Sequence, residues 1–233
     1  MKVGIFTDSH YSSEQVTCET RFNNKSLRKI EEALSFFKAE KCDRIICLGD
    51  LIDHEDDHTL LLNNLQSIAI LFRATSLKYT VLMGNHDCFS LTQNEFYSII
   101  GDEARPTPFI FENKTVIFMD ACYYSNGEHY SPEKSHDWMD TNCQSPTKLQ
   151  EELKAVNGFC YIFIHQNLDP DIPESCRLNN DKTVRKILED SGKVITVFQG
   201  HYHLGNKKRV NGIEYITIPA MCENEKAFFI YQL

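Results

Sequence analysis

A largely apolar run, 44–48, which begins with Arg44, ends directly in Gly49 and Asp50. Such a run is typical of a buried strand. A glycine at its end lets the backbone turn sharply, and Asp50 is then held at the carboxyl end of the strand, where open α/β sheets place their binding sites. Because a carboxylate has two oxygens, Asp50 could contact two hard cations at once. The alternative is that Asp50 caps the helix that follows.

The alternation of apolar runs with helical periodicity predicts an α/β fold. In the first half, predicted strands at 2–7, 43–48 and 79–83 alternate with predicted helices at 24–39 and 58–74. This order favours parallel neighbouring strands with helices packed on the sheet. The second half adds predicted helices at 92–100, 146–156 and 181–190, and predicted strands at 109–112, 115–120, 159–164, 194–199, 207–211, 213–218 and 226–232.

Turn signals and polar segments complete this outline. Asn113-Lys114 and Asn211-Gly212 predict tight hairpins, and the closing strands are expected to be antiparallel. No linker or internal repeat divides the sequence, so we expect two αβ halves, stacked through their sheets, in one domain over residues 1–233. The long polar segment 121–146 is typical of a functional lid or a flexible insertion.

The composition argues against several classes of protein. The chain is 42% hydrophobic and 24% charged, and its net charge of −9 disfavours a dedicated nucleic-acid surface, which is usually basic. No apolar stretch approaches the roughly 20 residues of a membrane span, and the chain begins in a predicted strand with no recognisable leader. Nine scattered cysteines without a C-x-x-C pair favour a reducing compartment. We therefore expect a cytoplasmic protein without a membrane partner.

Side chains that can bind metal ions follow the predicted strands. Asp8 and His10 are two residues apart, as are His201 and His203, and on an extended chain this spacing points both side chains to one face. None of the donors is a cysteine, and mixed imidazole, carboxylate and amide donors favour manganese, iron, zinc or a similar divalent ion. A single such residue is more often a surface residue or a chance match, but five blocks in order favour a metal centre. The seven donors are Asp8, His10, Asp50, Asn85, His165, His201 and His203.

These blocks resemble the calcineurin-like metallophosphoesterase superfamily over nearly the full chain. The resemblance implies a four-layer αββα sandwich, an α/β (α+β) fold of two mixed sheets flanked by helices. It also implies two divalent metal ions, with manganese preferred here. The matching blocks are D-S-H at 8–10, G-D-L-I-D at 49–53, G-N-H-D at 84–87, His165 and G-H-Y-H at 200–203.

Carried over position by position, the resemblance implies a ligand set for each ion. The first ion would be held by Asp8, His10, Asp50 and His203. The second would be held by Asn85, His165 and His201, with Asp50 bridging the two. Cations roughly 3.5–4 Å apart can activate a water and polarise phosphoryl oxygens.

Two further residues are candidates for catalysis. His86 follows the expected ligand Asn85 and is free to face a substrate; in the superfamily, the corresponding histidine stabilises the transition state or protonates the leaving oxygen. Asp53 would hold it, since a carboxylate behind an imidazole raises its pKa and fixes its tautomer. The alternative for Asp53 is a residue that starts the next helix.

The expected activity is hydrolysis of phosphoester or phosphoanhydride bonds by a metal-activated water. Asp53 stands where purple acid phosphatases have a tyrosine ligand, and the chain has no room for the capping domain of the repair nucleases. A looser resemblance, including residues 176–180, points to manganese-dependent ADP-ribose/CDP-alcohol diphosphatases. A small, nucleotide-like diester or diphosphate is therefore the preferred substrate. A phosphomonoesterase and a non-catalytic, metal-binding interaction scaffold are the alternatives.

Several other residues have two readings. Aromatic and histidine side chains in 121–146 could stack on a base or pack the segment down. Arg177 or Asn180 could contact a phosphate. His54 and His58 could line the site, although a polar helix start favours solvated side chains. The ring-bearing residues in question are Tyr123, Tyr124, His129, His136 and Trp138.

Overall fold

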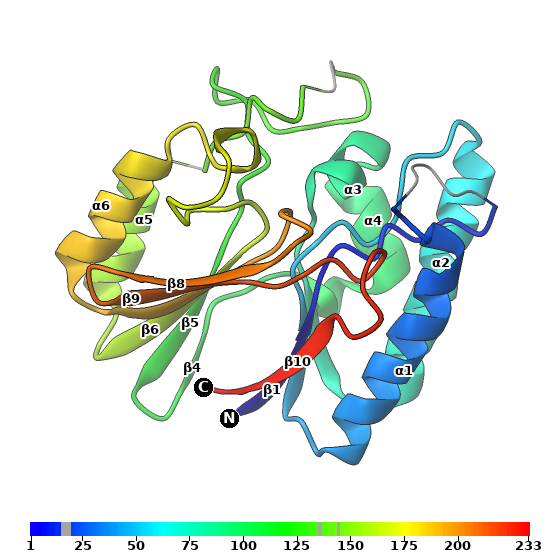
Figure 1. Ribbon diagram of the computed structural model, residues 1–233, viewed down its shortest axis with the longest axis horizontal. Coiled ribbons are helices and arrows are strands. Elements are labelled where there is room, and N and C mark those ends of the chain that lie inside the picture. Colours follow the sequence, from blue (N-terminus) through cyan, green and yellow to red (C-terminus); the bar gives the residue numbers. More distant parts are fainter. Residues whose placement is uncertain (15–19, 135–136, 144) are drawn as a thin grey trace.

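Two β-sheets packed face to face form the centre of the molecule, and helices cover the outer face of each (Figure 1). The computed structural model describes residues 1–14, 20–134, 137–143 and 145–233. The arrangement confirms the expected four-layer αββα sandwich of two mixed sheets. Among the described residues, no helix is both long and apolar enough to cross a membrane.

The first sheet has four strands in the order β10-β1-β2-β3. The strands β1 (Lys2–Phe6), β2 (Arg44–Cys47) and β3 (Lys78–Val81) run parallel, and β10 (Phe228–Gln232) pairs antiparallel with β1. The helices on this sheet are α1 (Ser26–Ala39), α2 (His58–Thr75) and α4 (Gln93–Ile100). A short 3-10 helix, η1 (Asn23–Lys25), precedes α1, and another, η2 (Asp102–Ala104), follows α4.

The second sheet has six strands in the order β4-β5-β6-β7-β9-β8. Its strands are β4 (Phe109–Phe111), β5 (Lys114–Met119), β6 (Phe159–Ile164), β7 (Val194–Gln199), β8 (Asn206–Val210) and β9 (Ile213–Thr217). The helices α5 (Pro146–Ala155) and α6 (Asp181–Ser191) lie on its outer face, and a 3-10 helix, η3 (Glu174–Cys176), lies between β6 and α6.

The closing strands are only partly antiparallel, which corrects the expectation from sequence. β8 and β9 form the predicted hairpin, and both turn residues, Asn211 and Gly212, have positive φ values of 49° and 88°, as a tight hairpin turn requires. However, β9 pairs parallel with β7. A strand's own residues do not record the direction of its neighbour, so the sequence pattern could not distinguish these pairings.

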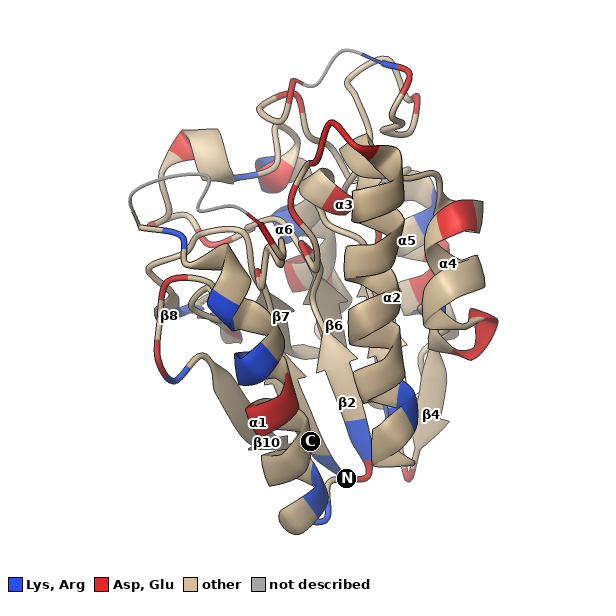
Figure 2. Ribbon diagram, turned by 90° about the vertical axis from the view of Figure 1, so that its right-hand side faces the viewer, with Lys and Arg blue, Asp and Glu red and all other residues tan. Residues whose placement is uncertain are grey.

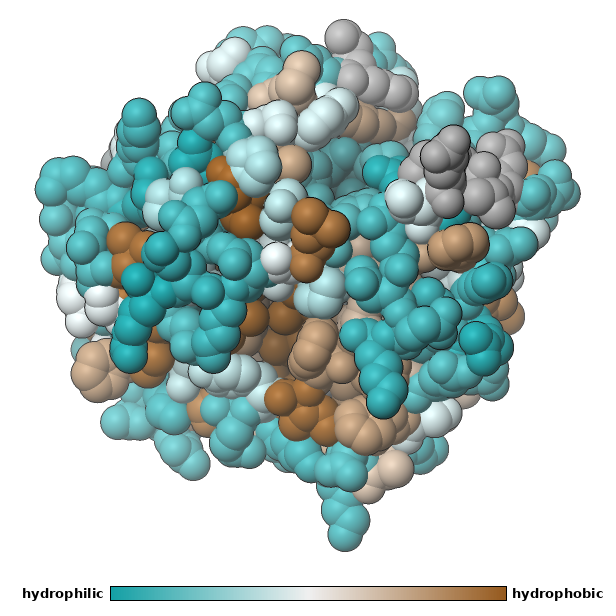
Figure 3. Space-filling model, in the orientation of Figure 1, coloured by the Kyte–Doolittle hydropathy of each residue, from teal (hydrophilic) through white to brown (hydrophobic). Residues whose placement is uncertain are grey.

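The apolar core has three layers, one between the sheets and one under each set of helices. Along β1, Val3 and Ile5 face the second sheet, whereas Gly4 faces α1, where an added Cβ would overlap the ring of Phe37. Between the sheets, Phe163 and Phe198 stack with ring centroids 4.7 Å apart. Figure 3 shows apolar side chains gathered between the sheets on the face that carries β8, β9 and β10.

The parallel strands of both sheets end at the same edge of the sandwich, so the loops that come after them lie together there (Figure 1). A short helix that sequence reasoning missed, α3 (Asn85–Ser90), begins at this edge directly after β3. Figure 2 shows several Asp and Glu residues in the loops beyond the strand ends, with a few Lys and Arg residues among them.

The described part of segment 121–146 is packed down by its own aromatic side chains. Tyr130 stacks on Phe89 of α3 at 4.6 Å and contacts Tyr124 at 4.5 Å between ring centroids. The Tyr130 hydroxyl also donates to the Asp140 carbonyl at 2.8 Å. These residues therefore hold the segment against the first sheet's helices, which favours packing over base stacking for Tyr124.

We expect Asp120→Asn to destabilise the protein in a pH-dependent way. His129 Nε2 lies 3.1 Å from Asp120 Oδ2; burial lowers the pKa of His129, but the carboxylate outweighs burial and raises that pKa above its usual value of 6.5. The stabilisation is thus complete below pH about 6.5 and disappears as the pH rises through the folded-state pKa. Thermal denaturation should show a larger loss of Tm at pH about 6 than at pH about 9.

A matched control is Asp102→Asn, which removes an exposed ion pair with Arg105. Because arginine stays charged over this range, any loss of Tm in this variant should not change between the two pH values. An Asp120→Asn defect of equal size at both pH values would contradict the assignment.

Candidate metal centre

Backbone geometry at the strand ends aims the candidate ligands at one point. Four of them, Asp8, His10, Asp50 and His201, have positive φ values of 51°, 41°, 50° and 62°. Non-glycine residues adopt this left-handed conformation at an energetic cost, and such residues cluster at functional sites. Gly49 (φ 116°) has no room for a Cβ, which would lie 2.6 Å from the Gly84 nitrogen. The turns after β1, β2 and β7 are thus built for the site rather than for local stability.

One group of donors gathers around His10. Its Nε2 lies 3.7 Å from Asp8 Oδ1, 3.5 Å from Asp50 Oδ2 and 3.3 Å from His203 Nε2. His203 Nε2 is also 3.6 Å from Asp8 Oδ1. Atoms spaced in this way can all reach one cation at the metal–ligand distances of about 2.0–2.2 Å that nitrogen and oxygen donors adopt. The four residues are those expected for the first ion.

A second group of donors gathers around His165. Its Nε2 lies 3.3 Å from Asp50 Oδ2 and 3.3 Å from Asn85 Oδ1. His201 completes the group, with its ring centroid 5.2 Å from that of His165. The ligand atoms of Asp50, His165 and His201 all lie within 4.8 Å of one another. The structure therefore brings together all seven donors predicted from sequence.

Asp50 links the two groups through a single oxygen. Its Oδ2 faces both His10 and His165, whereas Oδ1 accepts a hydrogen bond from the backbone N–H of His86 at 2.9 Å. From the sequence we expected only that the two oxygens of Asp50 would let it contact two cations. The His86 N–H engages Oδ1, so Oδ2 alone faces both groups of donors.

The site contains buried polar atoms for which a cation is the natural partner. Two atoms of the described donor set, Asp8 Oδ1 and His201 Nε2, are buried without a hydrogen-bond partner. Asp8 and Asp50 are almost fully buried, and a buried carboxylate is costly unless it is paired with a charge or a metal ion. The donor set and its unpaired atoms fit two divalent cations.

Several of these groups are already in the forms that bind metals. Burial and the charge of His165 lower the pKa of His201 to about 3, and burial and His86 lower that of His10 to about 4, so both imidazoles are neutral at pH 7. Burial opposes ionisation of Asp50, but the charges of His165 and His86 outweigh it and hold the pKa of that carboxyl well below its usual range. Neutral imidazoles and ionised carboxylates are the forms that bind metals.

The other two imidazoles carry a proton without a metal. Burial lowers the pKa of each ring, but Asp50 outweighs burial and raises the pKa of His165 to about 10, and Asp8 likewise raises that of His203 to about 9. A cation would therefore have to displace a proton from each of these two rings.

A second layer of contacts orients the ligands. His165 Nδ1 lies 3.0 Å from the Leu48 carbonyl, and His203 Nδ1 lies 2.9 Å from Glu223 Oε1. Each contact fixes the ring so that Nε2 faces the site. Asp87 accepts hydrogen bonds from the backbone N–H groups of Leu51 and Gly84, at 2.9 and 3.0 Å, and so ties together the loops after β2 and β3.

His86 lies beside the first group and is oriented by Asp53. Its Nδ1 is 2.8 Å from Asp53 Oδ1, and its ring lies edge-on to His10 at 4.5 Å. Asp53 in turn accepts from Asn23 Nδ2 at 2.6 Å and pairs with Arg21 at 3.7 Å. Burial lowers the pKa of His86, but Asp50 and Asp53 outweigh burial and raise it. The side chain is 26% exposed, so it can face an incoming molecule.

Other candidate residues divide between the site and the scaffold. Trp138 lies near the second group, with its ring centroid 5.7 Å from that of His201. Arg177 pairs with Asp181 at 3.4 Å, and Asn180 Oδ1 accepts from the Cys143 N–H at 3.1 Å, which are structural contacts. His54 and His58 are exposed, and Tyr123 contacts His129. His136 lies outside the described residues.

Five residues around the site escaped sequence reasoning about roles. They come from three separate parts of the chain, the segments around 21–23 and 222–223 and the end of the G-N-H-D block, so no common local pattern marks them. The block G-N-H-D contained the one signal that could have been used, its final aspartate. The residues are Arg21, Asn23, Asp87, Cys222 and Glu223.

The chain matches the model of the calcineurin-like phosphoesterase family over residues 1–205. It therefore belongs to the calcineurin-like phosphoesterases, whose activity is metal-dependent hydrolysis of phosphoesters. A comparison with curated protein sequences gave no match.

Solved structures support the same fold. A dimetal phosphatase from Danio rerio is similar with a TM-score of 0.84 at 19% identity, over 100% of this chain and 92% of the other. The protein TT1561 of Thermus thermophilus has a TM-score of 0.60 at 10% identity, over 95% and 90% of the two chains. Phosphopantetheinyl hydrolase from Mycobacterium tuberculosis has a TM-score of 0.57 at 12% identity, also over 95% and 90%.

We expect divalent cations to stabilise the fold through this site. A ligand that binds the folded state at about one hundred times its Kd stabilises it by about 2.7 kcal/mol. Adding manganese or zinc to protein stripped with a chelator should therefore raise Tm, as measured by differential scanning calorimetry. His201→Ala should lose most of the increase, whereas His58→Ala, which removes an exposed histidine of α2, should keep it. An equal increase in both variants would place the bound cations elsewhere.

Proposed function

We propose that this protein is a dinuclear metal-dependent hydrolase that cleaves the phosphoester or phosphoanhydride bond of a small, nucleotide-like diester or diphosphate. The observation that carries the proposal is the sharing of Asp50 Oδ2 between two groups of donors, with the His86–Asp53 pair beside them. Ligand completeness distinguishes this hypothesis from a non-catalytic scaffold, because a scaffold has no need to keep every donor.

The residues of the site have separate tasks in this proposal. Asp8, His10, Asp50 and His203 would hold one cation, and Asp50, Asn85, His165 and His201 the other. When bound, such a pair of cations polarises phosphoryl oxygens and lowers the pKa of a water.

His86 would supply the proton that the leaving oxygen needs. Its Nδ1 is engaged by Asp53, so Nε2 is the atom that can face the substrate. Because Asp50 and Asp53 raise the pKa of His86, the imidazolium form is available near neutral pH. Asp53 is a positioning residue, which sets the tautomer and the ring orientation.

Two side chains beside the candidate metal ligands support a substrate larger than a bare phosphate. Trp138, 39% exposed, offers a ring face next to His201, and aromatic faces bind flat, apolar groups such as nucleobases. Beside His86, Arg21 is a cation that lies 3.7 Å from Asp53, and guanidinium groups bind phosphate oxygens. A phosphoryl group between them could therefore carry both a base and a second phosphate or ester group.

The proposed cations and compartment follow from the donors and the thiols. Nitrogen and oxygen donors are compatible with manganese, iron or zinc, and manganese is the ion that we prefer for the centre. The eight described cysteines are free, and all except Cys176 are buried. Free thiols are typical of a reducing compartment, which supports a cytoplasmic location.

His86→Ala should retain the bound metal but lose most of its turnover. The substitution removes a proton donor and not a ligand, and such groups contribute about 10²–10⁴-fold to rate. Metal content by elemental analysis and kcat in the same preparation test both parts. Asp53→Asn should reduce kcat less, because His86 remains. Unchanged kcat in His86→Ala would exclude it as the proton donor.

Trp138→Ala should raise KM for nucleotide diphosphates and leave the hydrolysis of small aryl diesters unchanged, because only the former can use the ring. A panel of cyclic nucleotides, nucleoside-diphosphate sugars and alcohols, and monoesters, assayed with manganese, tests the substrate class. If monoesters were hydrolysed best by a wide margin, the protein would be a phosphomonoesterase, and the metal centre would be unaffected by that result.

A further inference from the structure

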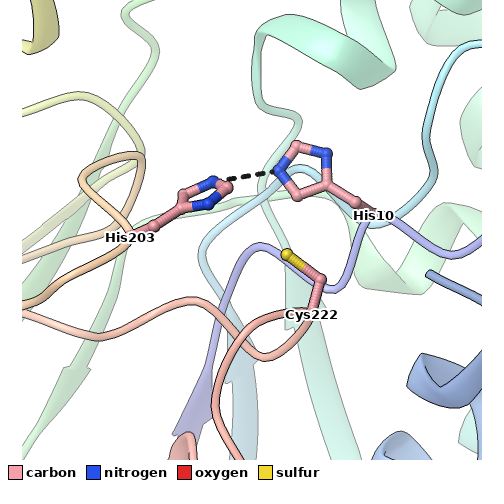
Figure 4. Close-up of side chains that lie close together, drawn as sticks. All are labelled: His10, His203 and Cys222. Carbon is pink, nitrogen blue, oxygen red and sulfur yellow. Dashed lines mark hydrogen bonds between the residues drawn. The ribbon is translucent and has the colours of Figure 1, made fainter. Parts of the chain in front are cut away.

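A short segment near the end of the chain contributes a cysteine to the first group of donors. Residues 220–223 follow β9 and lie beyond the part of the chain that matches the family. Cys222 Sγ and the ligand atoms of His10 and His203 all lie within 4.8 Å of one another. Figure 4 shows the thiol pointing toward the two imidazoles, whose Nε2 atoms are 3.3 Å apart.

The position of this thiol is fixed by the backbone around it. The Cys222 N–H donates to the Asp8 carbonyl at 3.0 Å, and the Cys222 carbonyl accepts from the Phe22 N–H at 3.0 Å. The buried ammonium of Lys29 donates to the carbonyls of Met221 and Asn224, both at 3.0 Å. Cys222 itself is fully buried. The backbone that carries the buried thiol is therefore held in place.

The atoms around the thiol point to a cation and not to ordinary core packing. Asp8 Oδ1 lies 3.6 Å from His203 Nε2 and 3.7 Å from His10 Nε2, and it is buried without a hydrogen-bond partner. The next residue, Glu223, orients His203 through its Nδ1. Two successive residues of the segment thus contact the first group: Cys222 lies near His10 and His203, and Glu223 orients the His203 ring.

We propose that the Cys222 thiolate is an additional ligand of the first cation, next to Asp8, His10, Asp50 and His203. The bond forms as the thiol proton passes to solvent, as metal binding to cysteine requires. Thiolate ligands select zinc more strongly than imidazole and carboxylate ligands do, whereas manganese prefers oxygen donors. We therefore expect a stronger preference for zinc over manganese at the first position than at the second. This inference rests on the metal centre of the proposed function.

X-ray absorption spectroscopy of the zinc-loaded, wild-type protein tests the proposal without any variant. A zinc–sulfur distance of about 2.3 Å should accompany the zinc–nitrogen and zinc–oxygen distances of about 2.0–2.2 Å. Bound zinc with nitrogen and oxygen neighbours alone would overturn the role of Cys222 and leave the proposed function standing. Protein that binds no zinc, manganese or cobalt would overturn both.

Cobalt substitution gives an independent test. Cobalt-loaded wild-type protein should show the near-ultraviolet charge-transfer absorption of a thiolate–cobalt bond. Cys222→Ala and Cys222→Ser should lose this absorption, whereas Cys176→Ser, which changes the one described cysteine that is not buried, should retain it. Circular dichroism confirms that each variant is folded. Retention of the band in both folded Cys222 variants would overturn the proposal.

Competition between zinc and manganese measures the consequence for metal choice. Loss of a residue that only orients a ligand already costs about 10–100-fold in metal affinity, so we expect loss of a direct ligand to cost at least about tenfold. In Cys222→Ala, the zinc affinity of the first position should fall by that factor while manganese binding stays within twofold or so. Equal losses for both metals, or none, would contradict a sulfur ligand.

Discussion

The fully buried carboxylate of Asp50 is the charge around which the molecule is arranged. Isolated in the interior, such a group would cost several kcal/mol, so its surroundings must supply positive charge and hydrogen-bond donors. The His86 N–H meets one oxygen, and His10 and His165 stand within 3.5 Å of the other. Those two imidazoles come from different sheets. The contacts of this one carboxylate thus link the two sheets at a single edge of the sandwich.

The cost of this arrangement lies in the backbone. Four site residues have left-handed backbone conformations, which cost energy and persist only where the surrounding structure enforces them. They are Asp8, His10, Asp50 and His201. The sheets can bear this strain because the inner core, with Phe163 and Phe198 stacked between the layers, holds the strands in register regardless of how they end. Different parts of the chain therefore provide stability and the site: residues in the middle of each strand pack in the core, and residues just after the strand ends are the candidate metal ligands.

This separation explains what could be predicted from the sequence. Strands with apolar middles and polar ends can be recognised locally, so the sandwich and the seven donors followed from spacing and from the resemblance of the blocks. The contacts that depend on distant parts of the chain could not be recognised in this way. Glu223 meets His203 across twenty residues, Asn23 meets Asp53 across thirty, and Cys222 approaches His10 from the far end of the chain. The parallel pairing of β9 with β7 escaped for the same reason.

The pairing of β1 with β10 has a consequence for the life of the newly made chain. Residues 2–6 and 228–232 are hydrogen-bond neighbours, and the segment around Cys222 closes on the end of β1. During synthesis on the ribosome, β1 therefore keeps an unpaired edge until almost the whole of this sequence has emerged, and unpaired edges invite aggregation. Closing so long a loop is also slow. The first sheet therefore completes its hydrogen-bond pairing only when the last strand of this sequence is available, and the contacts of residues 221 and 222 with the end of β1 form equally late.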